Sequence, residues 1–227
     1  MERLVIEHFE DRIEKQEYIG QREMKPLPDH LEGRLLEVGC GARLTYAPMN
    51  SEVCGIDISL KMARYFTKNH PIAQMVVADA RALPFRKGSF DIAVMNKVLH
   101  HLVGRTPHES LHNATNALNE VKRILRHTGT LLLIELVSRS FLFSLVIFYT
   151  TLLCAKLGID IDLLDIHSGV VTFFYTDAAL KQISSIAGFT IKESELACWK
   201  LLKLELGRQV TYSLSRRPTE PPMPHDQ

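Results

Sequence analysis

The chain has 227 residues, of which 46% are hydrophobic and 23% are charged. This balance excludes a disordered, fibrous or collagen-like protein and allows one large domain or two small ones. Its 27 basic and 26 acidic residues leave a net charge of +1, which lacks the basic footprint of a general nucleic-acid binder. Four widely spaced cysteines without a CxxC pair argue against a zinc ribbon or a disulfide scaffold and suit a reducing compartment.

Three parts are predicted along the chain. Residues 1–32 form a helical arm that ends at Pro26 and Pro28, because a proline pair does not continue a helix. Residues 33–215 form the main domain, and residues 216–227 form a disordered tail with four prolines. The N-terminal stretch is charged and shows no secretory signal, so we expect a cytoplasmic protein.

In the main domain, short apolar runs alternate with helical patterns. Such alternation implies crossover connections and a mostly parallel sheet covered on both faces, so the fold class is α/β. Ser59 and Thr176 are predicted N-caps, and Gly129 and Gly188 lie past the ends of helices. Strands are predicted at residues 34–39, 53–58, 73–78, 90–96, 130–137, 189–198 and 209–214, and helices at 60–69, 111–125 and 177–187.

Residues 141–155 are an uncharged apolar run that Lys156 closes, within an insertion predicted at residues 138–170. The run is shorter than the about 20 residues that span a membrane. It is apolar around its whole circumference, so a single sheet face would not bury all of it. Three interpretations stay open: a buried helix or a subunit contact in a homo-oligomer, a lid or peripheral membrane anchor for a lipophilic substrate, and a membrane span.

The stretch that indicates chemistry follows the first predicted strand. Gly39 and Gly41 let the backbone turn sharply and approach a ligand closely. Asp57 lies 20 residues after Glu37, at the end of the second strand. An acidic side chain at that place can accept hydrogen bonds from both hydroxyls of a ribose.

Two kinds of ribose-bearing cofactor compete for this site. A nicotinamide dinucleotide needs a glycine at position 44, where the chain has Leu44, and a helix N-terminus aimed at its pyrophosphate. Pro48 follows Gly41 by only seven residues and leaves room for barely one helical turn. The pattern therefore favours an adenosine-bearing cofactor without a phosphate.

Three segments in order, residues 35–41 (LLEVGCG), 55–59 (GIDIS) and 77–80 (VADA), resemble the motifs of class I S-adenosylmethionine-dependent methyltransferases. The order and spacing are similar to the small-molecule group that includes the quinone-biosynthesis enzymes. The resemblance implies a Rossmann-like, doubly wound, seven-stranded sheet with its last strand antiparallel, and S-adenosyl-L-methionine as cofactor. It covers residues 33–215, and it extends through residues 83–85 (LPF), 89–102 (SFDIAVMNKVLHHL), 120–125 (EVKRIL), 175–180 (YTDAAL) and 187–189 (AGF).

The resemblance also implies a role for each site residue. Asp57 would bind the ribose hydroxyls, and Ile58 would pack on one face of the adenine. Asp79 would take the adenine amino group, and Ala80 would offer its backbone amide. Asn96 lies where the chain passes the methionine end of the cofactor. The loop under the methionine moiety and the ribose would comprise Glu37, Gly39, Cys40 and Gly41.

Arg43 departs from the family pattern, which has a third glycine at this position. Its guanidinium turns to solvent or to the cofactor carboxylate, or it impairs binding. The departure motivates one alternative, a non-catalytic methyltransferase-like partner protein. A nicotinamide-dependent oxidoreductase is a second alternative, already weakened by Leu44 and Pro48.

His100 and His101 follow the fourth predicted strand, at the edge where open α/β sheets place ligands. An imidazole there could deprotonate a methyl acceptor; the alternative is a helix-start element that shapes the pocket. His108 and His112 stand four residues apart, but without an HExxH pattern or a cysteine partner a solvated face is favoured. No metal site is predicted.

A polar cluster follows the apolar run. Relatives carry substrate-binding insertions in this region, so the cluster either orients or deprotonates an acceptor or forms a solvated loop. Its members are Asp160, Asp162, Asp165 and His167. Glu135, at the end of the fifth strand, is another side chain that could face the pocket.

The predicted reaction is transfer of a methyl group from S-adenosylmethionine to a small, lipophilic acceptor. The sulfonium already activates the methyl group, so the protein mainly aligns the acceptor about 3–3.5 Å from it. A general base matters only for acceptors that must lose a proton. This chemistry agrees with a chain that carries no GxSxG motif and no catalytic cysteine context.

Overall fold

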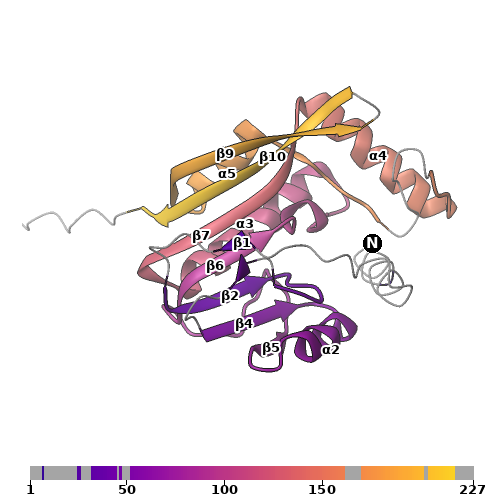
Figure 1. Cartoon of the computed structure of the whole chain (residues 1–227). Coiled ribbons are helices and arrows are strands. Elements are labelled where there is room, and N and C mark those ends of the chain that lie inside the picture. Colours follow the sequence, from indigo (N-terminus) through magenta and orange to yellow (C-terminus); the bar gives the residue numbers. More distant parts are fainter. Residues whose placement is uncertain are drawn as a thin grey trace, which may run out of the picture.

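The computed structural model describes residues 7, 25–26, 32–44, 46–47, 52–161, 170–201 and 204–217. Seven strands of the described chain form one sheet: β2 (Arg34–Val38), β4 (Glu52–Asp57), β5 (Gln74–Val77), β6 (Phe90–Asn96), β7 (Leu125–Ser138), β9 (Phe189–Leu201) and β10 (Leu204–Arg216). Their order is β5-β4-β2-β6-β7-β10-β9 (Figure 1). β2, β4, β5, β6 and β7 run parallel, and β10 is antiparallel to both of its neighbours.

This topology confirms the predicted α/β sheet with its last strand antiparallel. A two-residue strand, β8 (Tyr175–Thr176), adds to β7 and was not predicted. β7 also begins five residues before its predicted start at Thr130, because α3 (Pro107–Ile124) passes directly into it. Residues 126–128 there are polar and exposed, and the pairing register with β6 shifts, so the apolar pattern did not reveal the start of the strand.

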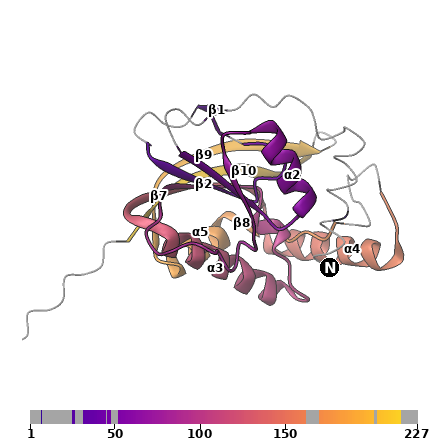
Figure 2. The same cartoon turned by 90° about the horizontal axis from the view of Figure 1, so that it is seen from below.

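Neighbouring residues of β2 face opposite sides of the sheet, as strand geometry requires. Leu36 packs in the larger apolar cluster with α3 and α5 (Asp177–Ile186), whereas Leu35 packs in a smaller cluster with Phe66 of α2 (Leu60–Asn69). The helices accordingly cover both faces, with α2 on one side and α3 and α5 on the other (Figure 2).

Each of the three helices begins at a side-chain cap. Ser59 and Thr176 accept hydrogen bonds from the backbone N–H groups of Met62 and Ala179, which confirms both predicted N-caps. α3 begins four residues before its predicted stripe, because Thr106 caps it and Pro107 takes the first helical position.

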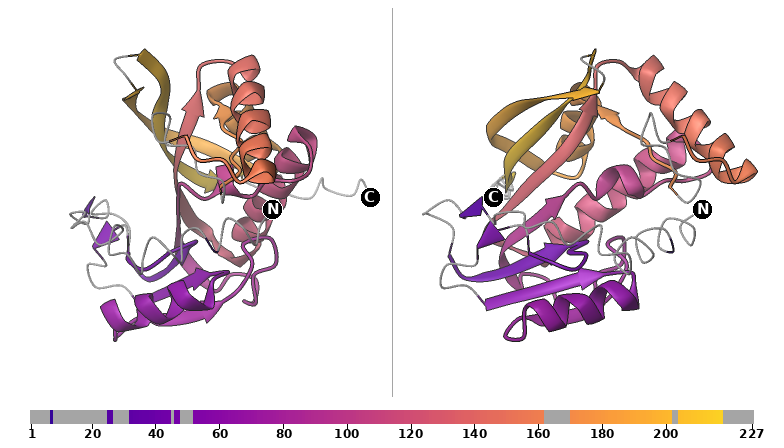
Figure 3. Two further views of the ribbon diagram at one scale, coloured as in Figure 1. Left: turned by 90° about the vertical axis from the view of Figure 1, so that its right-hand side faces the viewer. Right: turned by 45° about the vertical axis from the view of Figure 1, so that its right-hand side comes forward.

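The uncharged run forms a helix of 17 residues, α4 (Phe141–Leu157). The Ser140 hydroxyl caps its start, and Gly158, at φ +66°, ends it in the left-handed conformation. The helix lies at the periphery of the molecule, beyond the C-terminal ends of the central strands (Figure 3). Within the described residues, no helix has both the length and the apolar character needed to cross a membrane.

The segment after the glycine loop is not helical where it is described. Residues 41–44 form a turn, and β3 (Tyr46–Ala47) pairs in parallel with β1 (Lys25–Pro26) of the N-terminal arm. This agrees with the expectation that no full helix follows the loop. The helical pattern predicted early in the arm and the proline-rich tail after Arg217 lie outside the described residues.

Candidate functional site

The predicted cofactor residues meet at one edge of the sheet. Four parallel strands, β5, β4, β2 and β6, end side by side, with Val38 opposite both Ile56 and Met95. This is the carboxyl edge, where open α/β sheets bind ligands. The glycine loop follows β2, Asp57 ends β4, the turn with Asp79 follows β5, and Asn96 ends β6.

The glycine loop is built for close approach. Gly39 and Gly41 adopt φ of +65° and +55°, a region that side chains disfavour. A Cβ atom on Gly39 would lie 2.7 Å from Cγ2 of Val98, so the loop contacts the chain that leaves β6. A Cβ atom on Gly41 would meet no atom of the described residues within 4 Å. The described part of the chain therefore leaves the space beside Gly41 open to a ligand.

Asp57 borders this open space. Its Oδ2 accepts a hydrogen bond from the Gly41 amide at 2.9 Å, and its Oδ1 accepts one from the Ser59 amide at 2.9 Å. These two bonds fix the carboxylate beside the glycine loop, and a carboxylate is an acceptor for hydroxyl groups. The next side chain, Ile58, is 44% exposed although it is apolar. Asp57 and Ile58 together fit a ribose at the carboxylate and one face of an adenine at the apolar side chain.

Glu37 and Cys40 lie beneath the loop. Glu37 is buried within β2. The Cys40 thiol points into the core, 3.6 Å from Sδ of Met75. Burial, with the nearby charges of Asp57 and Glu37, raises the pKa of the Cys40 thiol well above its usual value, so the thiol is not a nucleophile. Any contact of Cys40 with a cofactor is therefore made by its main chain.

Asp79 is paired with a residue that the sequence analysis did not single out. Arg81 donates to both carboxylate oxygens, with Nη2–Oδ2 at 2.6 Å, and its amide donates to Oδ1 at 2.8 Å. Burial raises the pKa of Asp79, but the bonds from Arg81 outweigh it and lower the pKa below its usual value. An adenine amino group at Asp79 must therefore share the carboxylate with Arg81. Ala80, beside it, is buried.

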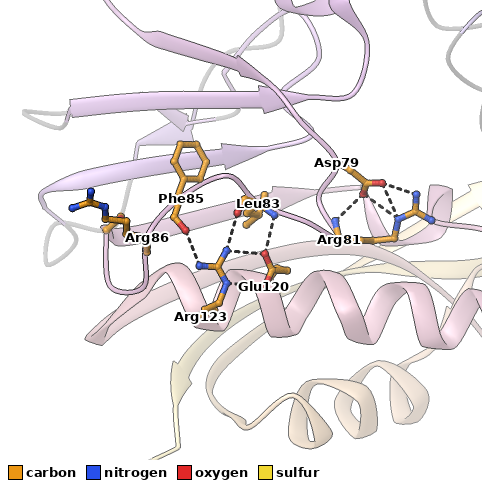
Figure 4. A network of polar contacts seen from close by, with 8 residues as sticks. Asp79, Arg81, Leu83, Phe85, Arg86, Glu120 and Arg123 are labelled. Carbon is orange, nitrogen blue, oxygen red and sulfur yellow. Dashed lines mark hydrogen bonds and ion pairs between the residues drawn. The ribbon is translucent and has the colours of Figure 1, made fainter.

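The loop that follows Asp79 is tied to α3 by an ion pair (Figure 4). Glu120 accepts a hydrogen bond from the Leu83 amide at 2.8 Å, and Arg123 donates to the carbonyl oxygens of Leu83 and Phe85 at 2.8 and 2.6 Å. Arg123 also bonds Glu120 and holds the pKa of that carboxyl below its usual value. The sequence signal was the family segment at residues 120–125, whose link to this loop was not predicted.

A second polar pair lies beyond the end of β6. His100, in the short helix η1 (Leu99–His101), directs Nδ1 at Oε1 of Glu135, and both side chains are buried. Glu135 also accepts from the amides of Leu99 and Leu136 at 2.9 and 2.8 Å. An ionised carboxylate only accepts, so Nδ1 of His100 is the donor in its contact with an ionised Glu135.

The surroundings of this pair are aromatic. The ring of His101 lies 4.0 Å from that of His100, between centroids, and the ring of Phe174 lies 5.2 Å away. The Phe173 amide donates to the His100 carbonyl at 3.0 Å. The structure therefore brings His100 and Glu135 together and places an apolar segment, residues 170–174, against them.

The remaining candidates are exposed or lie outside the described residues. His108 and His112 are exposed on α3. Asp160 is exposed after α4, while Asp162, Asp165 and His167 lie outside the described residues. In the described ranges, no group of three or more His, Cys, Asp or Glu residues could hold a metal ion.

Arg43, the departure in the glycine loop, is exposed. The loop is held from beneath by the end of α2, where His70 Nε2 accepts from the Leu44 amide at 3.1 Å and Asn69 donates to the Ala42 carbonyl at 2.9 Å. Burial, and then the charge of Arg43, lower the pKa of His70. The neutral imidazole is therefore the form that accepts this bond.

Comparisons with known proteins agree with this geometry. Residues 36–133 match the model of a family described as a methyltransferase domain. An uncharacterized protein of Methanocaldococcus jannaschii, MJ1123, is 29% identical over 128 residues, 56% of this chain and 57% of that protein. The chain spans about half the length of the curated relatives it matches.

Two solved structures share the fold. An S-adenosylmethionine-dependent methyltransferase from Methanosarcina mazei has a TM-score of 0.63 at 17% identity, with 85% of this chain and 99% of that one covered. A TehB-like S-adenosylmethionine-dependent methyltransferase from Corynebacterium glutamicum has a TM-score of 0.57 at 13% identity, covering 93% and 98%.

Residues 36–133 therefore match a methyltransferase domain, and the chain shares the fold of two S-adenosylmethionine-dependent methyltransferases. The family implies S-adenosylmethionine as the cofactor, and the open space beside Gly41, with Asp57 at its border, fits that group. The roles of the individual site residues, and the likeness to the quinone-biosynthesis group, stay predictions.

Proposed function

We propose that the chain transfers a methyl group from S-adenosylmethionine to a small, lipophilic acceptor that loses a proton in the reaction. The observation that carries this proposal is the buried His100–Glu135 pair, which lies beyond the end of β6, two residues after the Val98 side chain that approaches the glycine loop. Bound S-adenosylmethionine supplies a methyl group on a sulfonium, so the tasks left to the protein are to hold the acceptor in line and to remove its proton.

The cofactor side of the site rests on fixed groups. Asp57 is held by the Gly41 and Ser59 amides and is the carboxylate that accepts the ribose hydroxyls in this proposal. Ile58 offers an exposed apolar surface to the adenine. The Gly39–Val98 contact joins this side to the chain that carries His100 two residues later.

The acceptor side uses His100 as general base. Glu135 accepts the Nδ1 proton and so fixes the tautomer in which Nε2 takes a proton from the acceptor. The two amides on Glu135 hold its carboxylate still, which makes Glu135 a positioning residue. The imidazolium formed during proton transfer lies beside this carboxylate and is stabilised by it.

The side chains near the proposed base support a lipophilic acceptor. Residues 170–174 are uncharged, and Phe174 lies against His100. Behind it the rings of Phe148, Phe173 and Tyr175 contact one another edge to face. Aromatic side chains favour an apolar acceptor because contact with them buries its apolar surface. They offer no hydrogen-bond partner to the polar groups of a charged acceptor.

An acceptor screen tests the proposal. Conversion of S-adenosylmethionine to S-adenosylhomocysteine is followed over quinols, phenols, thiols, amines and lipids, in pairs that share the reacting group but differ in an alkyl chain. We expect higher kcat/KM for the alkylated member of a pair. Equal or better turnover of the polar members would contradict a lipophilic acceptor.

Two variants test the base with the accepted substrate. His100→Gln is expected to lower kcat by about 10²–10³-fold while the Kd for S-adenosylmethionine stays within about twofold. Glu135→Gln keeps the size of the side chain and should lower kcat about tenfold and shift its pH profile. His112→Gln, an exposed imidazole on α3, is the matched control. Unchanged turnover in His100→Gln would assign the pair a purely structural role.

A further inference from the structure

Helix α4 is apolar on both its inner and its outer face. The side chains it buries are Ser144, Phe148, Thr151 and Cys154, and Leu145, Leu152 and Ala155 pack against the core beside them. Residues 141–155 carry no charge on any face. A surface helix ordinarily places polar side chains outward, so the outer face of α4 departs from the usual pattern.

Hydrogen bonds hold the helix in this orientation. Ser144 Oγ bonds Ser138 Oγ and donates to the Ser140 carbonyl at 3.2 Å. Thr151 Oγ1 donates to the Phe148 carbonyl at 3.0 Å and accepts from the Thr172 amide at 3.4 Å. Rotating the helix to bury its other face would break the bonds of Ser144 to Ser138 and of Thr151 to Thr172 and expose the hydroxyls. The outward face is therefore fixed.

That outward face is a continuous apolar stripe, here called the α4 stripe. From Leu142 on, its members recur at steps of three and four residues, so they lie along one side of the helix. Each is more than half exposed, and Leu142 reaches 71%. The stripe begins at Phe141 and continues through Leu142, Val146, Tyr149, Leu153 and Leu157. A stripe of this size on a protein surface marks a contact site.

We propose that the α4 stripe docks on the interfacial region of a phospholipid bilayer, with the helix lying in the membrane plane. The helix has 17 residues, too few for a span of about 20, and its inner face is already bonded to the protein. Exposed cations flank it, Arg139 before its start and Lys156 at its end, where they can meet lipid phosphates.

A second copy of the chain is a weaker occupant for the stripe. A stable protein interface takes about 20–30 residues from each side, whereas the stripe offers six. A bilayer accepts a single helix face, because binding grows with the apolar area that enters the acyl boundary.

In this arrangement one layer of aromatic side chains would separate the docked helix from the proposed base. Phe148 packs against Phe173, whose amide donates to the His100 carbonyl. A lipophilic acceptor dissolved in the bilayer would thus reach this region without crossing water. Lipid binding itself does not depend on methyl transfer, so it can be present even if the proposed reaction is wrong.

Vesicle co-sedimentation with the full chain tests the proposal, using vesicles of phosphatidylcholine and phosphatidylserine. The wild-type chain is expected to sediment with them. The double variant Leu142→Gln/Leu153→Gln should bind about 100-fold more weakly, because two exposed leucines no longer enter the acyl boundary. Lys156→Gln should weaken binding about fivefold.

The control carries the same change elsewhere on the surface. Ile72→Gln/Ile186→Gln removes two exposed isoleucines, 98% and 65% exposed, and should bind vesicles like the wild type. Melting temperatures of all chains should agree within about 2 °C, since every change is at the surface. Wild-type binding by the α4 double variant would overturn the proposal. A second result would also overturn it: the wild-type chain is a dimer by light scattering and binds no vesicles, and the α4 double variant is a monomer.

Discussion

The two halves of the molecule differ in the kind of contact that shapes their proposed sites. The half with the proposed cofactor site, residues 34–96 and here called the cofactor half, holds a glycine loop and Asp57 at the end of a neighbouring strand, fixed by backbone amides. The half with the proposed acceptor site, residues 97–217 and here called the acceptor half, joins groups far apart in sequence, such as His100 with Glu135 and the Thr151 hydroxyl with the Thr172 amide.

The difference follows from what each half must recognise. A nucleoside cofactor is bound by main-chain turns and carboxylates at set places of the fold, so its signals are short and local. An acceptor site is shaped by helices and loops that pack on the sheet, and its geometry depends on tertiary contacts. Variants with matched controls can break or sharpen this division.

The largest expected effect is in the cofactor half, at Asp57. Asp57→Ala removes the proposed acceptor of two ribose hydroxyls and the bonds that fix Gly41 and Ser59. Each bond to a charged group contributes about 1.5–3 kcal/mol, so the Kd for S-adenosylmethionine should rise at least roughly 150-fold. Equilibrium dialysis measures it. Glu52→Ala, an exposed carboxylate at the start of the same strand, should stay within about twofold.

The next effect concerns the two loop glycines. Gly39→Ala places a Cβ 2.7 Å from Val98 at positive φ, and should lower the free energy of unfolding by about 2–3 kcal/mol. Gly41→Ala meets no neighbour within 4 Å, so only the left-handed conformation, about 1 kcal/mol, opposes it. Urea unfolding measures both. Equal costs would mean that the Gly39–Val98 approach is not close in solution.

A smaller effect is expected where the two halves are tied together. Arg123→Gln removes the hydrogen bonds to Leu83 and Phe85 and should destabilise the chain by about 1–2 kcal/mol. It should also weaken S-adenosylmethionine binding several-fold, because the loop after Asp79 loosens. Arg126→Gln, which breaks only an exposed pair with Asp91, is the control. Equal affinity for S-adenosylmethionine in both variants would mean that the loop after Asp79 does not contribute to cofactor binding.

The smallest effect is a pH dependence at His70. Its pKa in the folded chain lies below the ordinary 6.5, so the folded state resists protonation. The stability it contributes is present above about pH 6.5 and is lost as the pH falls through the lowered pKa. Loss of the bond to the Leu44 amide amounts to about 1 kcal/mol, or 2–4 °C in Tm. His70→Gln should flatten the Tm profile between pH 5 and 7.5; an unchanged slope would contradict this origin.

Much of the cofactor half could be predicted from sequence. Glycines at positive φ and Asp57 at a strand end are required by local geometry, and both were found where expected. The hold of Arg81 on Asp79 was not predicted, because it depends on a side-chain conformation that spacing does not determine.

The acceptor half could be predicted only in outline. Helix α4 was expected as an uncharged run, but which face it buries is decided by hydrogen bonds of Ser144 and Thr151 that no periodicity shows. His100 and Glu135 were each noted at a strand end, and their pairing required the register of β6 against β7. Asp162, Asp165 and His167 lie outside the described residues, and their predicted roles stay predictions.

One measurement tests the central claim most directly: isothermal titration of the wild-type chain with S-adenosylmethionine, followed by NAD as competitor. A site formed by the glycine loop and Asp57 predicts one molecule bound per chain, with a Kd below about 100 μM, and no displacement by NAD. No heat at millimolar S-adenosylmethionine, or binding of NAD in its place, would contradict the account.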